Sequence, residues 1–182
     1  MILSYKNNYN RYIDNNIINN CYRPHIYKFC AVYVITSVFN YLMKGIIDPK
    51  EVITILGWSE SDITEGKIGN NNIINGIKKL SKNMIKTNIF LNNEQCINLD
   101  KIEINNYWDK IKYYIKNNNH TFIFHTKGHY TLVCGYIEEP SVDKNNNFII
   151  NENCEKNRKL VICEHRIKNE EDIKNGLLIQ IN

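Results

Sequence analysis

The spacing of apolar residues between positions 29 and 43 predicts an amphipathic helix, because they recur every three or four residues and share one face. These apolar residues are Ala31, Ile35, Val38, Phe39 and Leu42. A second helix is predicted where Asp48 and Glu51 have the spacing of a capping box. We expect Gly57 to end this second helix, and the polar stretch 57–72 to form a long loop that lines a cleft.

Helical spacing returns further along the chain and then gives way to strand-like alternation. Two more helices are predicted, at residues 73–80 and 107–115. From Thr121 onward, short apolar runs alternate with Asn, Lys and Glu clusters, which is typical of strands and turns. The runs are TFIFH, HYTLVCGY, NFIIN, KLVICEH and GLLIQI. This order predicts an α+β fold, with an N-terminal helical half packed on a C-terminal antiparallel sheet.

The composition is that of a globular protein. Hydrophobic residues make up 43% of the 182 positions and charged residues 23%, so we expect a single domain over residues 1–182. The net charge of +4 comes from scattered lysines rather than a basic stripe, which argues against nucleic acid as a partner. Neither a signal-peptide pattern nor a long apolar run is present, so we expect a cytoplasmic protein without a membrane span.

The six cysteines show no CxxC pair and no spacing typical of a disulfide framework, which favours reduced thiols in an intracellular protein. A structural zinc site needs four closely spaced ligands, and the nearest Cys and His along the chain are Cys163 and His165. We therefore expect neither a metal nor another cofactor.

Cys30 stands in the first turn of the first predicted helix. Unpaired backbone N–H groups and the positive end of the helix dipole favour a thiolate there, and they can also donate to a developing oxyanion. A cysteine in an apolar helix is more often a core residue, so Cys30 alone also has a purely structural interpretation. A histidine far along the chain changes that balance.

His129 opens the strand-like run that follows Gly128, and the glycine leaves room for a helix end to approach closely. An imidazole at this position is suited to act as the general base of a thiol nucleophile. His125, at the end of the preceding run, is a rival for the same role. We expect the carboxylates that follow, Glu138, Glu139 and Asp143, to form a solvated face.

Three stretches of the chain carry a family pattern. They are RPHIYKFCAVYVITSVFNYLMKG, KGHYTLVCGYIEE, and NFIINEN at residues 147–153. In this order they resemble the nucleophile helix, the histidine strand and the strand of the orienting residue in papain-like peptidases of the bacteriocin leader-processing kind. The resemblance covers most of residues 20–155. It implies a papain-like cysteine peptidase fold, with Cys30 as the nucleophile, His129 as the base and no cofactor.

The chain departs from this family where the oxyanion hole is built. Family members have a glutamine about six residues before the cysteine, but position 24 is Pro24 and no glutamine precedes Cys30. The remaining candidate donors are the Cys30 backbone N–H and the side chains of His25, Asn20 and Arg23.

The third member of the site is also irregular. The resemblance implies that Glu152 replaces the family aspartate and orients His129. Asn151 and Asn153 flank Glu152 and face the opposite side of a strand, so only one of these two faces can point to His129. Our prediction is Glu152, with Asn151 as the alternative and Glu164 on the next predicted strand as a further candidate.

The sequence thus predicts a cysteine peptidase or amide hydrolase with a Cys-His-(Glu/Asn) triad and a peptide or protein substrate. A bacterial or phage enzyme that cleaves peptides or cell wall fits this description, and the fold does not separate hydrolysis from transpeptidation. The first alternative is a weakened or inactive relative that binds a peptide or protein in the same cleft. A second alternative is a redox or metal-binding protein.

Overall fold

The structure is a computed structural model, and the residues that it describes fall into several ranges. The ranges are 10–22, 27–91, 101–116, 120–126, 128–139, 157–163, 167–168 and 176–182.

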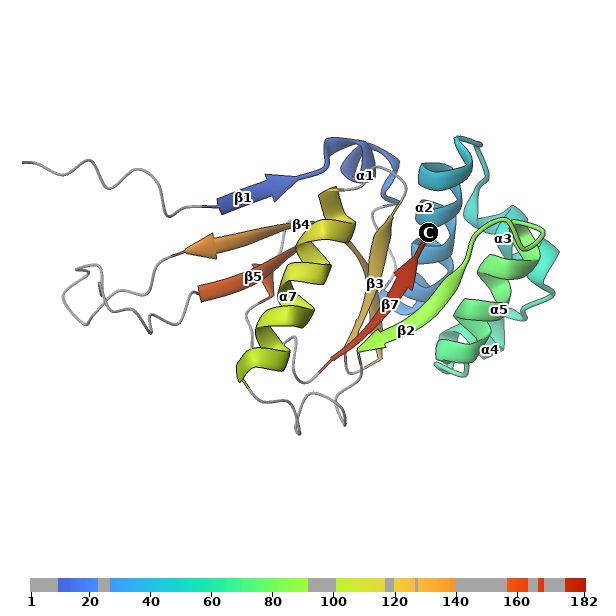
Figure 1. Ribbon diagram of the computed structural model, residues 1–182. Helices are drawn as coiled ribbons and strands as arrows, with labels where there is room; N and C mark the ends of the chain where they lie inside the picture. Colours follow the sequence, from blue (N-terminus) through green and yellow to red (C-terminus); the bar gives the residue numbers. More distant parts are fainter. Residues whose placement is uncertain are drawn as a thin grey trace, which may run out of the picture.

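A seven-stranded sheet forms the centre of the molecule, and every pairing among the described strands is antiparallel. The strands are β1 (Asn10–Ile13), β2 (Thr87–Leu91), β3 (Thr121–Thr126), β4 (His129–Glu139), β5 (Asn157–Ile162), β6 (Ile167–Lys168) and β7 (Leu177–Ile181). Their order is β2-β7-β3-β4-β5-β6, and β1 pairs with the far end of β4. The long strand β4 therefore holds three neighbours, β3 along its first half, β1 along its second half and β5 on its other edge (Figure 1).

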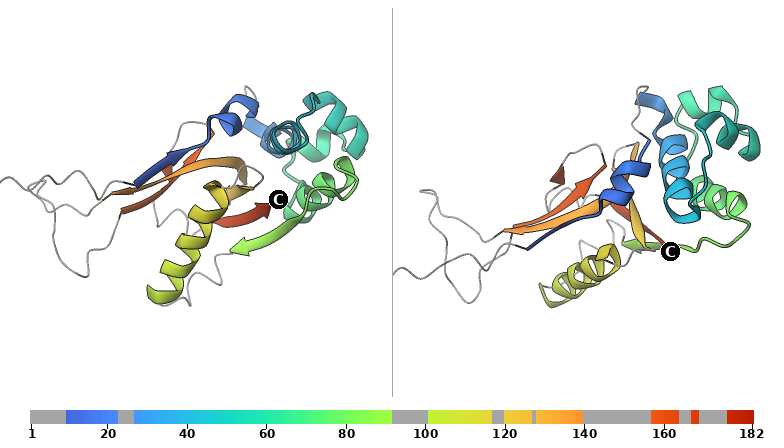
Figure 2. Two further views of the ribbon diagram at one scale, coloured as in Figure 1. Left: turned by 45° about the horizontal axis from the view of Figure 1, so that its top comes forward. Right: turned by 90° about the horizontal axis from the view of Figure 1, so that it is seen from above.

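Helices cover both faces of this sheet. They are α1 (Asn15–Asn20), the 3-10 turn η1 (Tyr27–Phe29), α2 (Cys30–Met43), α3 (Pro49–Leu56), α4 (Glu60–Thr64), α5 (Asn70–Leu80) and α7 (Lys101–Lys116). Helices α2 to α5 gather on one side, whereas α7 lies apart from them on the other face (Figure 2). Neighbouring residues of β4 point to opposite faces, so that Leu132 joins the core under α2 and Val133 joins the core under α7.

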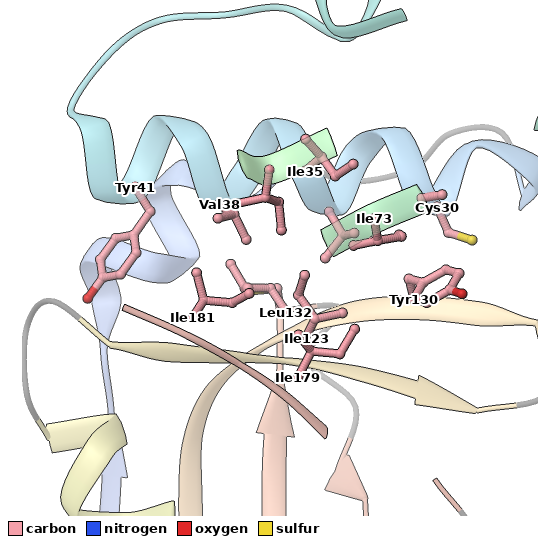
Figure 3. Packing of buried hydrophobic residues seen from close by; sticks show 14 of the residues in the cluster. Cys30, Ile35, Val38, Tyr41, Ile73, Ile123, Tyr130, Leu132, Ile179 and Ile181 are labelled. Carbon is pink, nitrogen blue, oxygen red and sulfur yellow. The ribbon is translucent and has the colours of Figure 1, made fainter. Parts of the chain in front are cut away.

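The apolar stripe of α2 packs directly on the sheet. Val38 is fully buried and points toward Leu132 of β4 and Ile181 of β7 (Figure 3), whereas Ile35, also fully buried, lies against Gly76 of α5. This packing fixes the helix above β4 and places its first residue, Cys30, over the beginning of the strand.

The predicted α+β layout of helices on an antiparallel sheet is confirmed, as are the helix that begins at Cys30 and the capping box between Asp48 and Glu51. Gly57 ends α3 with a left-handed φ of 72°. None of the described helices combines the length and the apolar character that crossing a bilayer requires.

The predicted long loop at 57–72 is wrong, because α4 lies within it and α5 begins at Asn70. The Ser59 side chain accepts a hydrogen bond from the Asp62 N–H and caps the N-terminus of α4. This N-cap was missed in the sequence because Gly57 and Gly66 on either side favoured a loop. Strands β1 and β2 were not predicted, and the run NFIIN lies outside the described residues.

The expected solvated face after the histidine strand is wrong for Glu138, which is 3% exposed and belongs to β4. Its carboxylate accepts hydrogen bonds from Trp108 Nε1 at 2.7 Å and from Lys112 Nζ at 3.2 Å, both on α7. Asn10 Nδ2 of β1 donates to the same group at 3.1 Å. One buried carboxylate therefore ties α7 and β1 to β4. Asp143 lies outside the described residues.

Replacing Glu138 by alanine should lower the free energy of unfolding by about 1–3 kcal/mol, because the buried Trp108 N–H loses its acceptor, whereas Lys112 keeps its ion pair with Asp109 at 2.9 Å. The adjacent Glu139→Ala is the matched control. Its partner Lys159 and Glu139 itself are partly exposed, at 28% and 34%, so its effect should stay at or below about 1 kcal/mol. Urea denaturation followed by circular dichroism measures both, and equal effects would contradict the role of the buried network.

Candidate active site

Cys30 is the first residue of α2, and the structure presents its thiol at the helix N-terminus. The N-cap residue is Phe29, whose apolar side chain cannot accept a hydrogen bond from the N–H groups of the first turn. Cys30 is 6% exposed and lies at the edge of the core under α2. The positive end of the helix therefore acts on a nearly buried sulfur.

The turn between β3 and β4 brings His129 to this sulfur. Thr126 and His129 are paired across the two strands, and Gly128 between them takes the left-handed φ of 76° that the tight turn requires. The Cys30 thiol donates to the Gly128 carbonyl oxygen at 3.8 Å, and the His129 side chain lies close enough to interact with the same thiol as a hydrogen-bond partner. The structure thus brings together the two residues that the sequence singled out.

Opposing effects act on the pKa of the Cys30 thiol. Burial, the largest single effect, raises this pKa because it penalises the charged form. The hydrogen bond and charge of His129, together with the backbone N–H groups of Tyr130 and Ala31, favour the thiolate. Together these favourable interactions outweigh the effect of burial, so the pKa of Cys30 lies below its ordinary value.

The other described thiols give a direct comparison. Cys134 and Cys163 are buried on the same side of the sheet, and Cys21 at the end of α1 is partly exposed. Hydrogen bonds with Cys134 and Cys21, and then burial, raise the pKa of Cys163 far above its ordinary value. The pKa values of two buried thiols in the same core therefore shift in opposite directions. Cys163 interacts with other thiols, whereas Cys30 has the His129 imidazole beside it.

Tyr130 and Asn70 are neighbours of the site that sequence reasoning missed. Tyr130 is 5% exposed, and its hydroxyl donates to Asn70 Oδ1 at the start of α5 at 2.8 Å. Burial, followed by the charge of Cys30, raises the pKa of Tyr130 to about 12. The aromatic residue after His129 was visible in the sequence, but nothing there indicated its reach to α5.

The rival base, His125, lies against Tyr130 rather than against the thiol. Its ring stacks on the Tyr130 ring with centroids 4.1 Å apart. Burial and then the charge of His129 lower the pKa of His125, which keeps it neutral at physiological pH. The hydrogen bond that acts on Cys30 comes from His129.

A small cavity of about 10 Å³ borders the Cys30 thiol. Its described lining consists of Cys21, Tyr22, Cys30, Tyr33, Val34, Ser37, Tyr130, Thr131 and Leu132. This volume suffices for about one water molecule.

Of the remaining candidate site residues, the structure describes only Asn20. Asn20 is at the end of α1, where its amide nitrogen donates to the Asn16 carbonyl at 2.8 Å, and it does not line the cavity. The other side-chain oxyanion candidates, His25 and Arg23, lie outside the described residues. The same holds for the orienting candidates Asn151, Glu152, Asn153 and Glu164.

Within the part of the chain that the structure describes, no three His, Cys, Asp or Glu side chains converge in a way that would hold a metal ion. Of the sequence pair Cys163 and His165, only the cysteine belongs to that part.

Searches against protein-family models, curated proteins and solved structures found no match to this chain.

Proposed function

We propose that this protein is a papain-like thiol hydrolase that cleaves an amide bond in a peptide or protein. The observation that carries the proposal is the meeting of the Cys30 thiol, on the first residue of α2, with the His129 side chain; burial raises the pKa of this thiol, but the interaction with His129 helps to bring the pKa below its ordinary value. Nucleophilic cysteines need such a partly buried, electropositive surrounding. The position of Cys30 on a helix and of His129 on the facing strand also supports a papain-like arrangement.

The chemistry follows from this pair. The Cys30 thiolate attacks the carbonyl carbon of the scissile bond, and the negative charge that forms on the carbonyl oxygen is stabilised by the Cys30 backbone N–H. The His129 imidazolium gives its proton to the leaving amine, and the acyl group remains on sulfur as a thioester. Neutral His129 then takes a proton from a water molecule, which attacks the thioester and releases the acid.

A third residue would hold the His129 ring in the correct orientation. Glu152 is the first candidate and Asn151 the second, both on the segment that resembles the orienting strand. An anion at this position also stabilises the imidazolium, which favours Glu152 over the amide.

The second candidate function is a peptide-binding relative without turnover. Two observations favour it, the absence of a glutamine before Cys30 and the burial of Cys30 to 6% exposure beside a cavity with room for one water. Loss of one oxyanion donor lowers the rate by about 10²–10³ in known hydrolases. In either form the partner is a peptide or protein, in the cytoplasm or, after release by another protein, at the cell wall.

Iodoacetamide at pH 7 tests the central proposal, because it reacts with thiolates rather than thiols. Cys30 should be alkylated at least about tenfold faster than Cys21, although Cys21 is the more exposed of the two. Mass spectrometry of the digested protein measures the two rates. Cleavage of a peptide library by the wild type, lost in Cys30→Ser, separates the hydrolase from the binding module. Faster reaction at Cys21 would mean that Cys30 is an ordinary core thiol.

The pH profile of this alkylation tests the pairing with His129. In the wild type, the lowered pKa should make Cys30 reactive below the ordinary thiol pKa of about 8.5. His129→Ala removes the hydrogen bond and the charge of the imidazole but leaves the burial, so the profile should move upward, toward the free thiol pKa of about 8.5. His125→Ala is the matched control, and it should shift the profile little. Equal profiles for the wild type and His129→Ala would mean that the two residues do not interact.

Substitution of the orienting candidates tests the third member. Glu152→Gln should reduce turnover far more than it reduces the free energy of unfolding, whereas Glu164→Gln should change turnover little. Peptide cleavage rates and urea denaturation of the two variants measure this ranking. The reverse ranking would assign the role to Glu164, and an unchanged Glu152→Gln would favour Asn151.

A further inference from the structure

Two tyrosine rings lie face to face beside the Cys30 thiol. The ring centroids of Tyr22 and Tyr33 are 5.6 Å apart with an interplanar angle of 5°, and both residues line the cavity next to Cys30. The Phe29 ring, one residue before the cysteine, packs at an angle on Tyr33 with centroids 6.2 Å apart. Tyr22 is 42% exposed, so one end of this aromatic stack faces solvent.

The position of the stack is fixed by α2. The Tyr22 backbone N–H donates to Ser37 Oγ at 2.7 Å, and the Ser37 hydroxyl donates to the Tyr33 carbonyl oxygen at 2.7 Å. Ser37 is 1% exposed, so this link is protected from water. Both rings are therefore held to the helix that presents the thiol, at a set distance from it.

The surroundings select an uncharged ligand. Apart from the proposed Cys30 thiolate, none of the described residues that line the cavity carries a formal charge. Burial and the neighbouring Tyr22 raise the pKa of Tyr33, so the phenol of Tyr33 stays neutral. The described cavity itself, at about 10 Å³, has room for about one water molecule. The exposed side of Tyr22 is a described surface beside the thiol on which a substrate side chain can lie.

We infer that the stacked Tyr22–Tyr33 pair binds an apolar side chain, with aromatic side chains preferred, of the peptide whose amide bond Cys30 attacks. This inference rests on the proposed function and names the substrate class of the same site. A rigid aromatic surface binds another ring by stacking at little entropic loss, and such a contact changes a rate or affinity by about two- to tenfold. Tyr22 is the residue that determines specificity, because it provides the exposed end of the stack.

Tripeptide vinyl sulfones that modify Cys30 test the inference. The probes are an all-alanine peptide and three versions with phenylalanine at one position each, and the readout is the ratio of their rate constants. In the wild type, at least one phenylalanine probe should react about two- to tenfold faster than the alanine probe. Tyr22→Ala should bring this ratio to about one, whereas Tyr22→Phe, which keeps the ring, should retain it. Circular dichroism of each variant reports whether it is folded.

The control is Tyr113→Ala, which removes an aromatic ring that is 65% exposed on α7, away from the site, and should leave the ratio unchanged. No phenylalanine preference in the wild type, or the same preference in Tyr22→Ala, would overturn the inference while leaving the thiol chemistry intact. Wild-type protein whose Cys30 reacts neither with the probes nor rapidly with iodoacetamide would instead overturn the proposed function.

Discussion

The packing of α2 on the sheet is the contact on which the other features of the site depend. Val38 of the helix and Leu132 of β4 lie on the shared interface and are almost completely buried. A buried side chain of this size contributes about 1.5–3 kcal/mol through the hydrophobic effect. This apolar contact has no chemical function of its own, but it holds a helix N-terminus and a strand start close enough for Cys30 and His129 to meet.

Where Cys30 and His129 meet, polar interactions lower the pKa of the thiol, whereas burial alone would raise it. A thiol that leaves water becomes harder to ionise. Cys30 experiences the same penalty, yet an imidazole and two backbone N–H groups outweigh it. Each of these donors belongs to a backbone segment whose position is fixed by secondary structure. The electrostatics of the site are therefore a product of the fold rather than of the cysteine.

The sequence was most informative where local rules decide the structure. Helical spacing located α2, the capping box located α3, and glycine before an alternating run located β4, so the residues of the Cys30 and His129 pair could be named in advance. Interactions between distant segments were not predictable. Nothing in the sequence indicates that Glu138 of β4 is buried, because its partners Trp108 and Lys112 come from a distant segment, helix α7.

Strand β1 and the aromatic stack were missed for related reasons. Residues 10–13 are too few and too polar to show alternation, and β1 exists because β4 offers it a free edge. The stack joins Tyr22, beyond the end of α1, to a ring on α2 through the hydroxyl of Ser37. In the sequence, a serine on a helix face gives no sign of such a link, because its hydroxyl can always bond to the backbone of its own helix.

The hydrogen bond between His129 and Cys30 has a consequence for how the chain acquires reactivity. The imidazole comes from a strand far along the chain, so the loop that the pair closes spans more than half of the sequence. In a growing or unfolded chain, the thiol has no such neighbour and behaves as a free cysteine. The lowered pKa of the Cys30 thiol therefore depends on a contact between distant segments, and it arises only when the hairpin of β3 and β4 has docked under α2.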